Sequence, residues 1–218
     1  MFTKPRHPGD TIDVARRGDQ AHGSDRRAGA TDHLRAGDRP GRPGPAAAAR
    51  AVGHGRVGGP RGSASGTPEE RIRRVIDTAR AQIGRGYSYS WGAGGYGGAS
   101  YGISSPSPDG HYDHDVLGFD GAGLTLYAFW NGAGIDIGAH PEAQYDHGSA
   151  RRVPYGQRAP GDLVLWGDAP SSATHVALYV GGDRIIEAAP PRDTDGIRVS
   201  RVDGPHGPPM SAVVRFIE

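Results

Sequence analysis

The sequence predicts an α+β fold for residues 67–218, with two helices ahead of a sheet built mostly from the second half of this segment. Two observations lead to this class. Helical patterns come first, at 67–83 and 120–130, and five short β-type runs follow, separated by turns rather than by helices. Strands joined by short turns pair antiparallel, so we expect the second helix to pack on a small antiparallel sheet or barrel.

Residues 1–66 differ in composition from the rest of the chain. They contain 12 Lys and Arg against 6 Asp and Glu, whereas residues 67–218 contain 13 and 18. Large apolar side chains are almost absent from the first segment, so it cannot bury enough surface to offset the cost of ordering. We therefore expect a disordered basic Arg/Gly/Pro-rich tail or linker at 1–66 and a folded domain at 67–218.

An alternative role for residues 1–66 is that of a basic arm that binds an anionic polymer. The acidic residues interspersed along the segment, and the lack of aromatic stacking partners beyond Phe2, argue against nucleic acid as that polymer.

The composition also excludes several classes of chemistry and bears on location. The chain has no cysteine, so disulfides, thiolate–zinc sites and a cysteine nucleophile are all excluded. No apolar run is long enough to predict a membrane span. The first 20 residues lack the apolar core of a secretory signal peptide, so no export signal is visible.

A surface helix is predicted at the start of the folded part. Thr67 is a good N-cap, Pro68 suits the first helical position, and Glu70 completes a capping box. Apolar residues then recur at helical spacing up to Ile83, and Gly84 ends the pattern. A single apolar face indicates that this helix covers a core.

Residues 84–117 are rich in Gly, Ser and Pro, and we expect a long irregular loop there. Loops of this length inside a compact domain are commonly functional. Five aromatic residues in this segment are candidates for the wall of a ligand groove: Tyr87, Tyr89, Trp91, Tyr96 and Tyr101. For Tyr89 and Trp91, a plain packing role at the edge of the core is the alternative.

Four residues of the same segment carry side chains that can ligate a metal: His111, Asp113, His114 and Asp115. No rigid element is predicted around them to fix a coordination geometry, so we interpret them as solvated loop residues. We accordingly predict no metal site and no cofactor.

Residues 117–130 predict a tight turn that leads into a buried helix. Asp120 is a good N-cap, and Gly121 to Gly123 give a first turn with almost no side chains, followed by an apolar run that reaches Trp130. A helix N-terminus has unpaired N–H groups and a partial positive charge, which favour an anion or a thiolate. Enzymes place nucleophiles at such positions, but here the residue is glycine.

Five β-type runs fill the rest of the chain. They are Leu163–Trp166, Thr174–Val180, Arg184–Ala188, Ile197–Val202 and Ala212–Ile217. Gly181, Gly182 and Asp183 indicate a hairpin turn between the second and third runs. His175 and Glu187 then fall roughly opposite each other across this hairpin, within reach of a cross-strand contact.

A histidine held by a carboxylate is the base half of a nucleophilic triad, because the carboxylate fixes the ring tautomer and stabilises the charged ring. His175 is the candidate base and Glu187 the residue that orients it. From the pattern alone, a purely structural His–Glu pair stands as the alternative.

Five motifs, in this order along the chain, resemble the NlpC/P60 family of cell-wall cysteine peptidases. They are Tyr89–Gly92, Gly118–Leu124, Pro160–Val164, His175–Tyr179 and Ile186–Ala188. The match extends over about residues 68–217. The resemblance implies a papain-like α+β fold and, as substrates, the stem peptides of bacterial peptidoglycan, commonly cut between D-glutamate and diaminopimelate. It also implies a location outside the cell or in the cell envelope.

The resemblance further implies roles for single residues. His175 matches the general base, and Glu187 matches the third triad member of those relatives that use glutamate. Tyr89 matches the aromatic residue that helps to line the substrate site. Trp91 lies in the same motif as Tyr89, and Asp120 immediately precedes Gly121. We take both as further substrate-binding candidates.

Gly121 is the departure that decides the expected chemistry. The family has Phe-Asp-Cys-Ser-Gly-Leu, whereas residues 119–124 here are Phe-Asp-Gly-Ala-Gly-Leu. Glycine supplies no nucleophile, and Thr125, one turn further along, is expected to point elsewhere. Removing the nucleophile of a triad removes most of the rate. We expect a small open space where the cysteine would lie, beside a groove that still binds ligand.

Three hypotheses of function follow. The first is a catalytically inactive NlpC/P60 protein that binds stem peptides or regulates an active cell-wall hydrolase. The second is a peptidoglycan endopeptidase whose nucleophile was removed by engineering or by sequence error. The third is a passive scaffold whose basic tail at 1–66 binds a polyanion.

Overall fold

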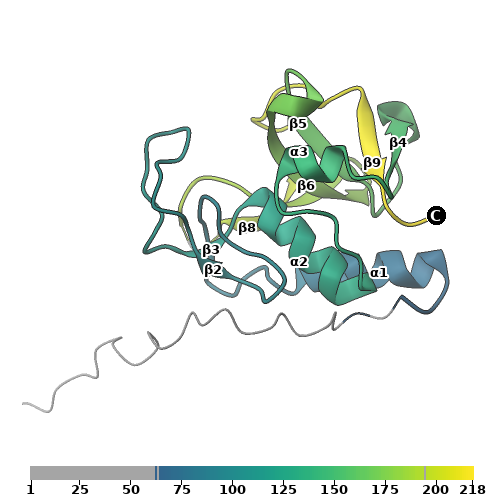
Figure 1. The fold of residues 1–218 in the computed structure, drawn as a ribbon, viewed down its shortest axis with the longest axis horizontal. Coiled ribbons are helices and arrows are strands. Elements are labelled where there is room, and N and C mark those ends of the chain that lie inside the picture. The colour runs from purple at the N-terminus through teal and green to yellow at the C-terminus, as the bar shows by residue number, and fades with distance from the viewer. Residues whose placement is uncertain (1–61, 63, 194) are drawn as a thin grey trace, which may run out of the picture. The chain divides into compact units, whose positions relative to one another are not determined.

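The computed structural model describes residues 62, 64–193 and 195–218. The predicted tail at 1–66, with its predicted disorder and basic-arm role, lies almost wholly outside the described residues. Within the described part, two helices pack beside a six-stranded sheet. The segment between β2 (Ser100–Tyr101) and β3 (Leu117–Phe119) projects away from the helices (Figure 1).

Helix α1 (Pro68–Arg80) begins as predicted, with the capping box formed. The Glu70 N–H donates to Thr67 Oγ1 at 3.3 Å, and the Thr67 N–H donates to Glu70 Oε2 at 3.0 Å. The helix ends at Arg80 rather than near Gly84, because the next residues tighten into turns with bonds to the third residue before them.

Helix α2 (Gly121–Ala133) is the buried helix that the sequence predicts. Ten of its 13 residues are buried. It ends at Gly134, which adopts the left-handed conformation with φ of 68°. Gly132 brings it close to α1, since a Cβ there would lie 2.7 Å from the backbone of Val75. Backbone proximity of this kind is open only to glycine.

The main sheet is antiparallel with strand order β4-β9-β5-β6-β7-β8. Its strands are β4 (Arg151–Pro154), β5 (Leu163–Gly167), β6 (Ala173–Gly181), β7 (Arg184–Ala188), β8 (Ile197–Arg201) and β9 (Ala212–Arg215). All five predicted strands are present within a residue or two. The edge strand β4 and the short helix α3 (Pro141–Tyr145) were not predicted. Only one residue of each is buried, so neither has an apolar pattern in the sequence.

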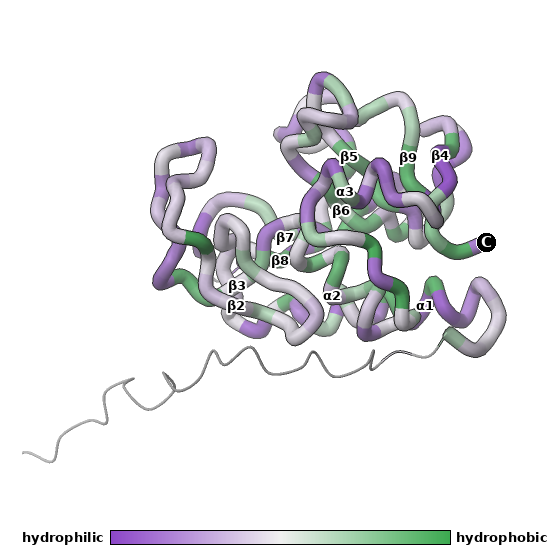
Figure 2. Tube along the Cα trace, in the orientation of Figure 1, coloured by the Kyte–Doolittle hydropathy of each residue, from purple (hydrophilic) through white to green (hydrophobic). Residues whose placement is uncertain are grey.

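Both faces of this sheet are covered by apolar side chains. Alternate residues of β5 and β6 enter two separate clusters, one packed around α2 and the other on the opposite face. Leu163 and Leu165 join the first, and Val164 and Trp166 the second. Figure 2 shows strand β9 in the colour of hydrophobic residues, whereas the projecting segment before β3 is mostly hydrophilic.

The prediction of an irregular loop at 84–117 is only partly correct, because this segment contributes strands to a second, three-stranded sheet. Its strands are β1 (Ser88–Tyr89), β2 (Ser100–Tyr101) and β3 (Leu117–Phe119), in the order β1-β3-β2. Strand β1 runs parallel to β3, and β2 antiparallel to it. Strands of two or three residues set among glycines have no periodicity to detect.

In the described residues no helix combines the length and the apolar character that a membrane crossing requires.

Candidate active site

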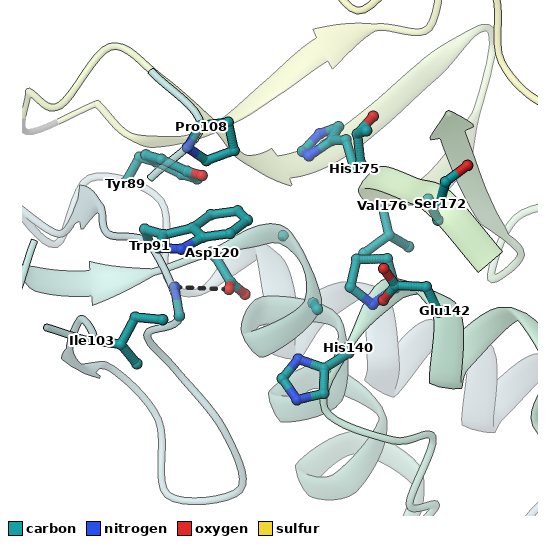
Figure 3. A pocket seen from close by; sticks show the side chains of 16 residues that line it. Tyr89, Trp91, Ile103, Pro108, Asp120, His140, Glu142, Ser172, His175 and Val176 are labelled. Atoms are coloured by element: carbon teal, nitrogen blue, oxygen red, sulfur yellow. Dashed lines mark hydrogen bonds between the residues drawn. The ribbon is translucent and has the colours of Figure 1, made fainter. Parts of the chain in front are cut away.

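A cavity of about 430 Å³ lies between the N-terminus of α2, the first half of β6 and the aromatic segment that follows β1. Among the 16 residues that line it are Tyr89, Trp91, Asp120, Gly121 and His175, five of the six residues predicted from the sequence (Figure 3). Glu187 does not line the cavity but lies behind His175. We refer to this cavity as the groove.

Gly121 is the first residue of α2 and lies directly against β6. A Cβ at this position would be 3.1 Å from His175 Nδ1 and 2.5 Å from the carbonyl oxygen of Val176. The ring of His175 therefore presents Nδ1 to position 121, where the resemblance described above implies a cysteine. The expected open space is wrong: a helix start without Cβ approaches the strand closely enough for the Val176 carbonyl to fill that volume.

Thr125 does not replace the missing nucleophile. Its hydroxyl donates to the Gln144 side-chain oxygen at 2.9 Å and lies near the carbonyls of Gly121 and Ala122, fully buried in the helix. The prediction that Thr125 points elsewhere is confirmed.

The predicted contact between His175 and Glu187 is confirmed. His175 Nε2 lies 3.0 Å from Glu187 Oε2. Leu178 pairs with Ile186 in the hairpin, so Glu187 falls diagonally from His175 on the same face of the sheet. Alternation along two strands thus brings together side chains 12 positions apart.

Glu187 is buried, with 1% of its surface exposed, and both of its carboxylate oxygens accept hydrogen bonds. Besides His175, it accepts hydrogen bonds from Ser200 Oγ at 2.5 Å and from His206 Nε2 at 2.7 Å, and Arg198 lies 3.5 Å away. Burial alone would raise the pKa of Glu187, but the hydrogen bonds from the two histidines and the serine outweigh it and hold this pKa well below its usual range.

The environment of His175 favours the neutral form of its ring. Burial lowers the pKa of its ring, and the hydrogen bond to Glu187 offsets only part of that effect. Because Glu187 accepts the Nε2 hydrogen, the lone pair remains on Nδ1, which faces position 121. The arrangement is that of a general base with no acidic side chain to deprotonate.

His206 is a site residue that sequence reasoning missed. Its ring stacks on that of His175, with centroids 4.2 Å apart and planes at 28°, and Trp166 lies 5.3 Å from both rings. It comes from the Gly- and Pro-rich segment between β8 and β9, where no periodic signal exists to point to it.

His175, Glu187 and His206 also form a possible ligand set for a metal. Two imidazole nitrogens and a carboxylate oxygen lie within 4.8 Å of one another, and zinc accepts such ligands. Both Nε2 atoms, however, already point at the same oxygen of Glu187 from stacked rings. We interpret the cluster as a hydrogen-bonded network, and the absence of a metal remains a prediction.

Asp120 joins helix α2 to the aromatic segment. Its Oδ1 accepts the Gly123 N–H at 2.7 Å, which is the predicted N-cap, and its Oδ2 accepts the Gly92 N–H at 3.0 Å (Figure 3). Burial raises the pKa of Asp120 to about 6, although the amide hydrogen bonds act in the opposite direction. Asp120 therefore fixes one edge of the groove.

Of the five aromatic candidates, the groove is lined by Tyr89 and Trp91 only. The prediction is wrong for the other three. Tyr87 packs edge-on against Phe119 and Tyr96 against Trp130, while Tyr101 is 58% exposed. Tyr89 is itself buried, so it both packs at the core edge and faces the groove.

The expectation of solvated residues at 111–115 is wrong for Asp113. His111, His114 and Asp115 are exposed, but Asp113 is fully buried and paired with Arg192, with Nε 2.6 Å from Oδ1. The partner is 79 positions away, so no local pattern could reveal the pair.

A helix N-terminus that faces a carboxylate-anchored histidine across a groove is the arrangement of a papain-like hydrolase site. The chain belongs to the NlpC/P60 family, whose sequence profile matches residues 86–213. The family assignment and the papain-like α+β class predicted from the sequence are thereby confirmed.

Relatives of this chain include two proteins named as peptidoglycan endopeptidases. Peptidoglycan endopeptidase RipA of Mycolicibacterium smegmatis is 36% identical over 133 residues, which are 61% of this chain and 24% of RipA. Peptidoglycan endopeptidase RipB of Mycobacterium tuberculosis is 37% identical over 143 residues, 61% of this chain and 54% of RipB. The chain thus spans about a quarter of the first relative and about half of the second.

A solved structure of RipD of Mycobacterium tuberculosis matches with a TM-score of 0.55 and 27% identity, over 67% of this chain and 98% of the chain in that structure. That protein is described as a non-catalytic NlpC/p60 domain protein adapted to peptidoglycan binding. The family therefore contains both endopeptidases and a binding protein.

Proposed function

We propose that this chain binds peptidoglycan stem peptides in its groove without cleaving them. The observation that carries the proposal is that the first residue of α2 is Gly121. A Cβ at this position would lie 3.1 Å from Nδ1 of His175, the basic nitrogen of the ring. His175 is placed as a general base, yet residue 121, which it faces, has no nucleophilic side chain. Hydrolysis by the family's route requires one.

The groove supports ligand binding despite this loss. Tyr89 and Trp91 supply apolar walls, and Asp120 and His175 supply polar groups close to the helix N-terminus. Concave sites with apolar walls and a few convergent polar groups are typical of ligand pockets. A stem peptide carries methyl groups, which suit the apolar walls, and carboxylates, which suit the helix N-terminus. In the roles we assign, His175 and Glu187 are remnants of the catalytic base, and Tyr89, Trp91 and Asp120 contact ligand.

The setting we propose follows from the relatives. Residues 67–218 form the binding domain, and residues 1–66 act as a tail or linker. The protein acts at the cell envelope or outside the cell, where its ligand is. An active cell-wall hydrolase is a further partner, which this domain would direct to, or shield from, the same peptides.

Purified sacculi test the proposal. We expect the full chain to co-sediment with sacculi and to release no soluble muropeptides, as measured by chromatography of the supernatant. Failure to co-sediment, or the appearance of cleavage products that a Gly121→Val variant does not release, would count against it.

A second candidate, a peptidoglycan endopeptidase that lacks only its cysteine, is favoured by the intact His175–Glu187 contact. It predicts that Gly121→Cys restores muropeptide cleavage and that adding His175→Ala abolishes it again. The Cys side chain must displace the Val176 carbonyl, which lies 2.5 Å from the Cβ position. A folded but inert Gly121→Cys protein would remove this candidate.

A third candidate, polyanion binding by residues 1–66, rests on the charge of that segment alone and lies outside the described residues. It predicts that deleting 1–66 abolishes binding to sacculi and that affinity falls steeply with salt. Binding through the groove predicts that the deletion leaves affinity for stem peptides unchanged.

A further inference from the structure

Arg192 lies between β7 and β8 and contacts two acidic residues of the segment between β2 and β3. Its guanidinium pairs with Asp113 through Nε and Nη2, at 2.6 and 3.0 Å, and with Asp109 through Nη1 and Nη2, at 2.7 and 3.0 Å. Nη2 also donates to Ser107 Oγ at 2.8 Å. One cation thus grips two carboxylates, each with two hydrogen bonds.

The contact with Asp113 leads directly to the groove. Asp113 is fully buried, and its Oδ2 also accepts the Trp91 N–H at 2.8 Å. Trp91 lines the groove. The backbone of this aromatic residue is therefore fixed by a carboxylate that Arg192 neutralises.

A second path from Arg192 reaches Tyr89. The guanidinium carbon lies 5.1 Å from the centre of the Tyr89 ring, within the range of a cation–π contact. Tyr89 is buried to 7% exposure and faces the groove.

A third path runs through Asp109 and Ser107 to Pro108, which lies between them in the chain. Pro108 lines the groove near Tyr89 (Figure 3). Tyr89, Trp91 and Pro108 form one wall of the groove. Arg192 does not line the groove itself, but it contacts Tyr89 directly and reaches Trp91 and Pro108 through their neighbours Asp113, Asp109 and Ser107.

We infer that Arg192 is the positioning residue for the Tyr89–Trp91–Pro108 wall of the groove and thereby sets the fit of the bound peptide. Lysine cannot replace it, because an ammonium cannot form both paired contacts at once. Loss of the cation would leave Asp113 as a buried carboxylate without its ion-pair partner, and the segment between β2 and β3, which carries Pro108, would detach from Tyr89 and Trp91. The statement about the bound peptide rests on the proposed function. The contacts of Arg192 with Asp109 and Asp113, which we call the clamp, do not depend on that function.

Two variants test the clamp, each with a matched surface control. Arg192→Lys weakens the grip, and Arg192→Met with Asp113→Asn removes both charges, so that no buried charge prevents folding. The controls are Arg201→Lys and Arg201→Met with Asp203→Asn, a pair that is exposed on both sides and distant in sequence from the wall.

Hydrogen exchange of the unliganded protein is the first measurement. We expect the hydrogen-bonded amides of Trp91, Gly102, Ile103 and Ser107 to exchange at least tenfold faster in both Arg192 variants, with exchange unchanged in both controls. Calorimetric titration with synthetic L-Ala-γ-D-Glu-meso-diaminopimelate is the second, and we expect Kd to rise at least tenfold in the Arg192 variants only.

Exchange and Kd both within twofold of the parent protein would overturn the inference. A raised Kd with unchanged exchange would also overturn it, since Arg192 would then act by contacting the ligand. If the parent protein does not bind the tripeptide, the proposed function fails, while the exchange measurement still decides whether the clamp exists.

Discussion

At the scale of single residues, Glu187 organises the site. Two imidazole N–H groups share one of its oxygens, and a serine hydroxyl donates to the other. Such a carboxylate holds the ring of His175 so that Nδ1 faces Gly121. The same geometry serves a general base in an enzyme, and here it fixes one wall of a groove.

Glu187→Gln is expected to lower the free energy of unfolding by about 1–3 kcal/mol, because the amide NH₂ opposes at least one donor in a buried site. Chemical denaturation monitored by circular dichroism measures this. Asp203→Asn, which removes a surface carboxylate paired with Arg201, serves as the control and should change stability by less than about 0.5 kcal/mol. Equal effects of the two substitutions would contradict the assigned role of Glu187.

Asp120 makes stability depend on pH in a defined direction. Its pKa is raised to about 6 in the folded protein, so the unfolded chain releases this proton at lower pH, and the stability that protonated Asp120 provides is lost as pH rises from about 4 through 6. Asp120→Asn keeps an N-cap but cannot ionise. Relative to the parent protein, this variant should gain up to about 2 kcal/mol between pH 4 and pH 7.

Denaturant midpoints at pH 4, 5, 6 and 7 check this prediction for Asp120. Glu187 and His175 act in the opposite direction, since both have lowered pKa values and lose stability as pH falls. Only the difference between the Asp120→Asn and parent curves therefore isolates Asp120. Parallel curves would show that its pKa is not raised.

Parts of this site could be predicted from the sequence, and the reason is local. His175 and Glu187 flank a short hairpin, so alternation and turn length place them together. His206 and Arg192 lie in irregular segments and act through partners 19 or more positions away. Their contacts depend on how separate segments pack, and no pattern in the sequence records that.

At the scale of elements, the contact between the start of α2 and strand β6 lies at the position where the sequence predicts a departure from the family pattern. The absence of a Cβ at Gly121 lets the helix approach the Val176 carbonyl. The helix itself could be predicted from its N-cap and apolar run, but its distance from the strand could not.

Gly121→Ala is expected to destabilise the protein by about 1–3 kcal/mol, although alanine is the better helix former, because its Cβ would lie 2.5 Å from a backbone oxygen. Thermal unfolding measures this. Gly148→Ala is the control, since that glycine is exposed and its Cβ position has no neighbour within 4 Å. A Gly121→Ala protein as stable as the control would mean that the helix and strand separate without cost.

At the scale of the whole molecule, the described part combines a six-stranded antiparallel sheet, the longer helices α1 and α2, the short helix α3 and a small sheet that carries the aromatic wall. The longer elements were predictable because apolar periodicity and turn residues extend over many positions. The small sheet was not, since its strands have two or three residues. The part of the fold that shapes the groove is thus the part with the weakest sequence signal.

The central claim, that the groove binds a stem peptide without cutting it, is tested most directly by nuclear magnetic resonance of the labelled protein with L-Ala-γ-D-Glu-meso-diaminopimelate. We predict saturable shifts of the Tyr89, Trp91 and Gly121 amides while the tripeptide signals persist unchanged for a day. Loss of the tripeptide signals with the appearance of free diaminopimelate, or shifts confined to residues outside the groove, would contradict the account.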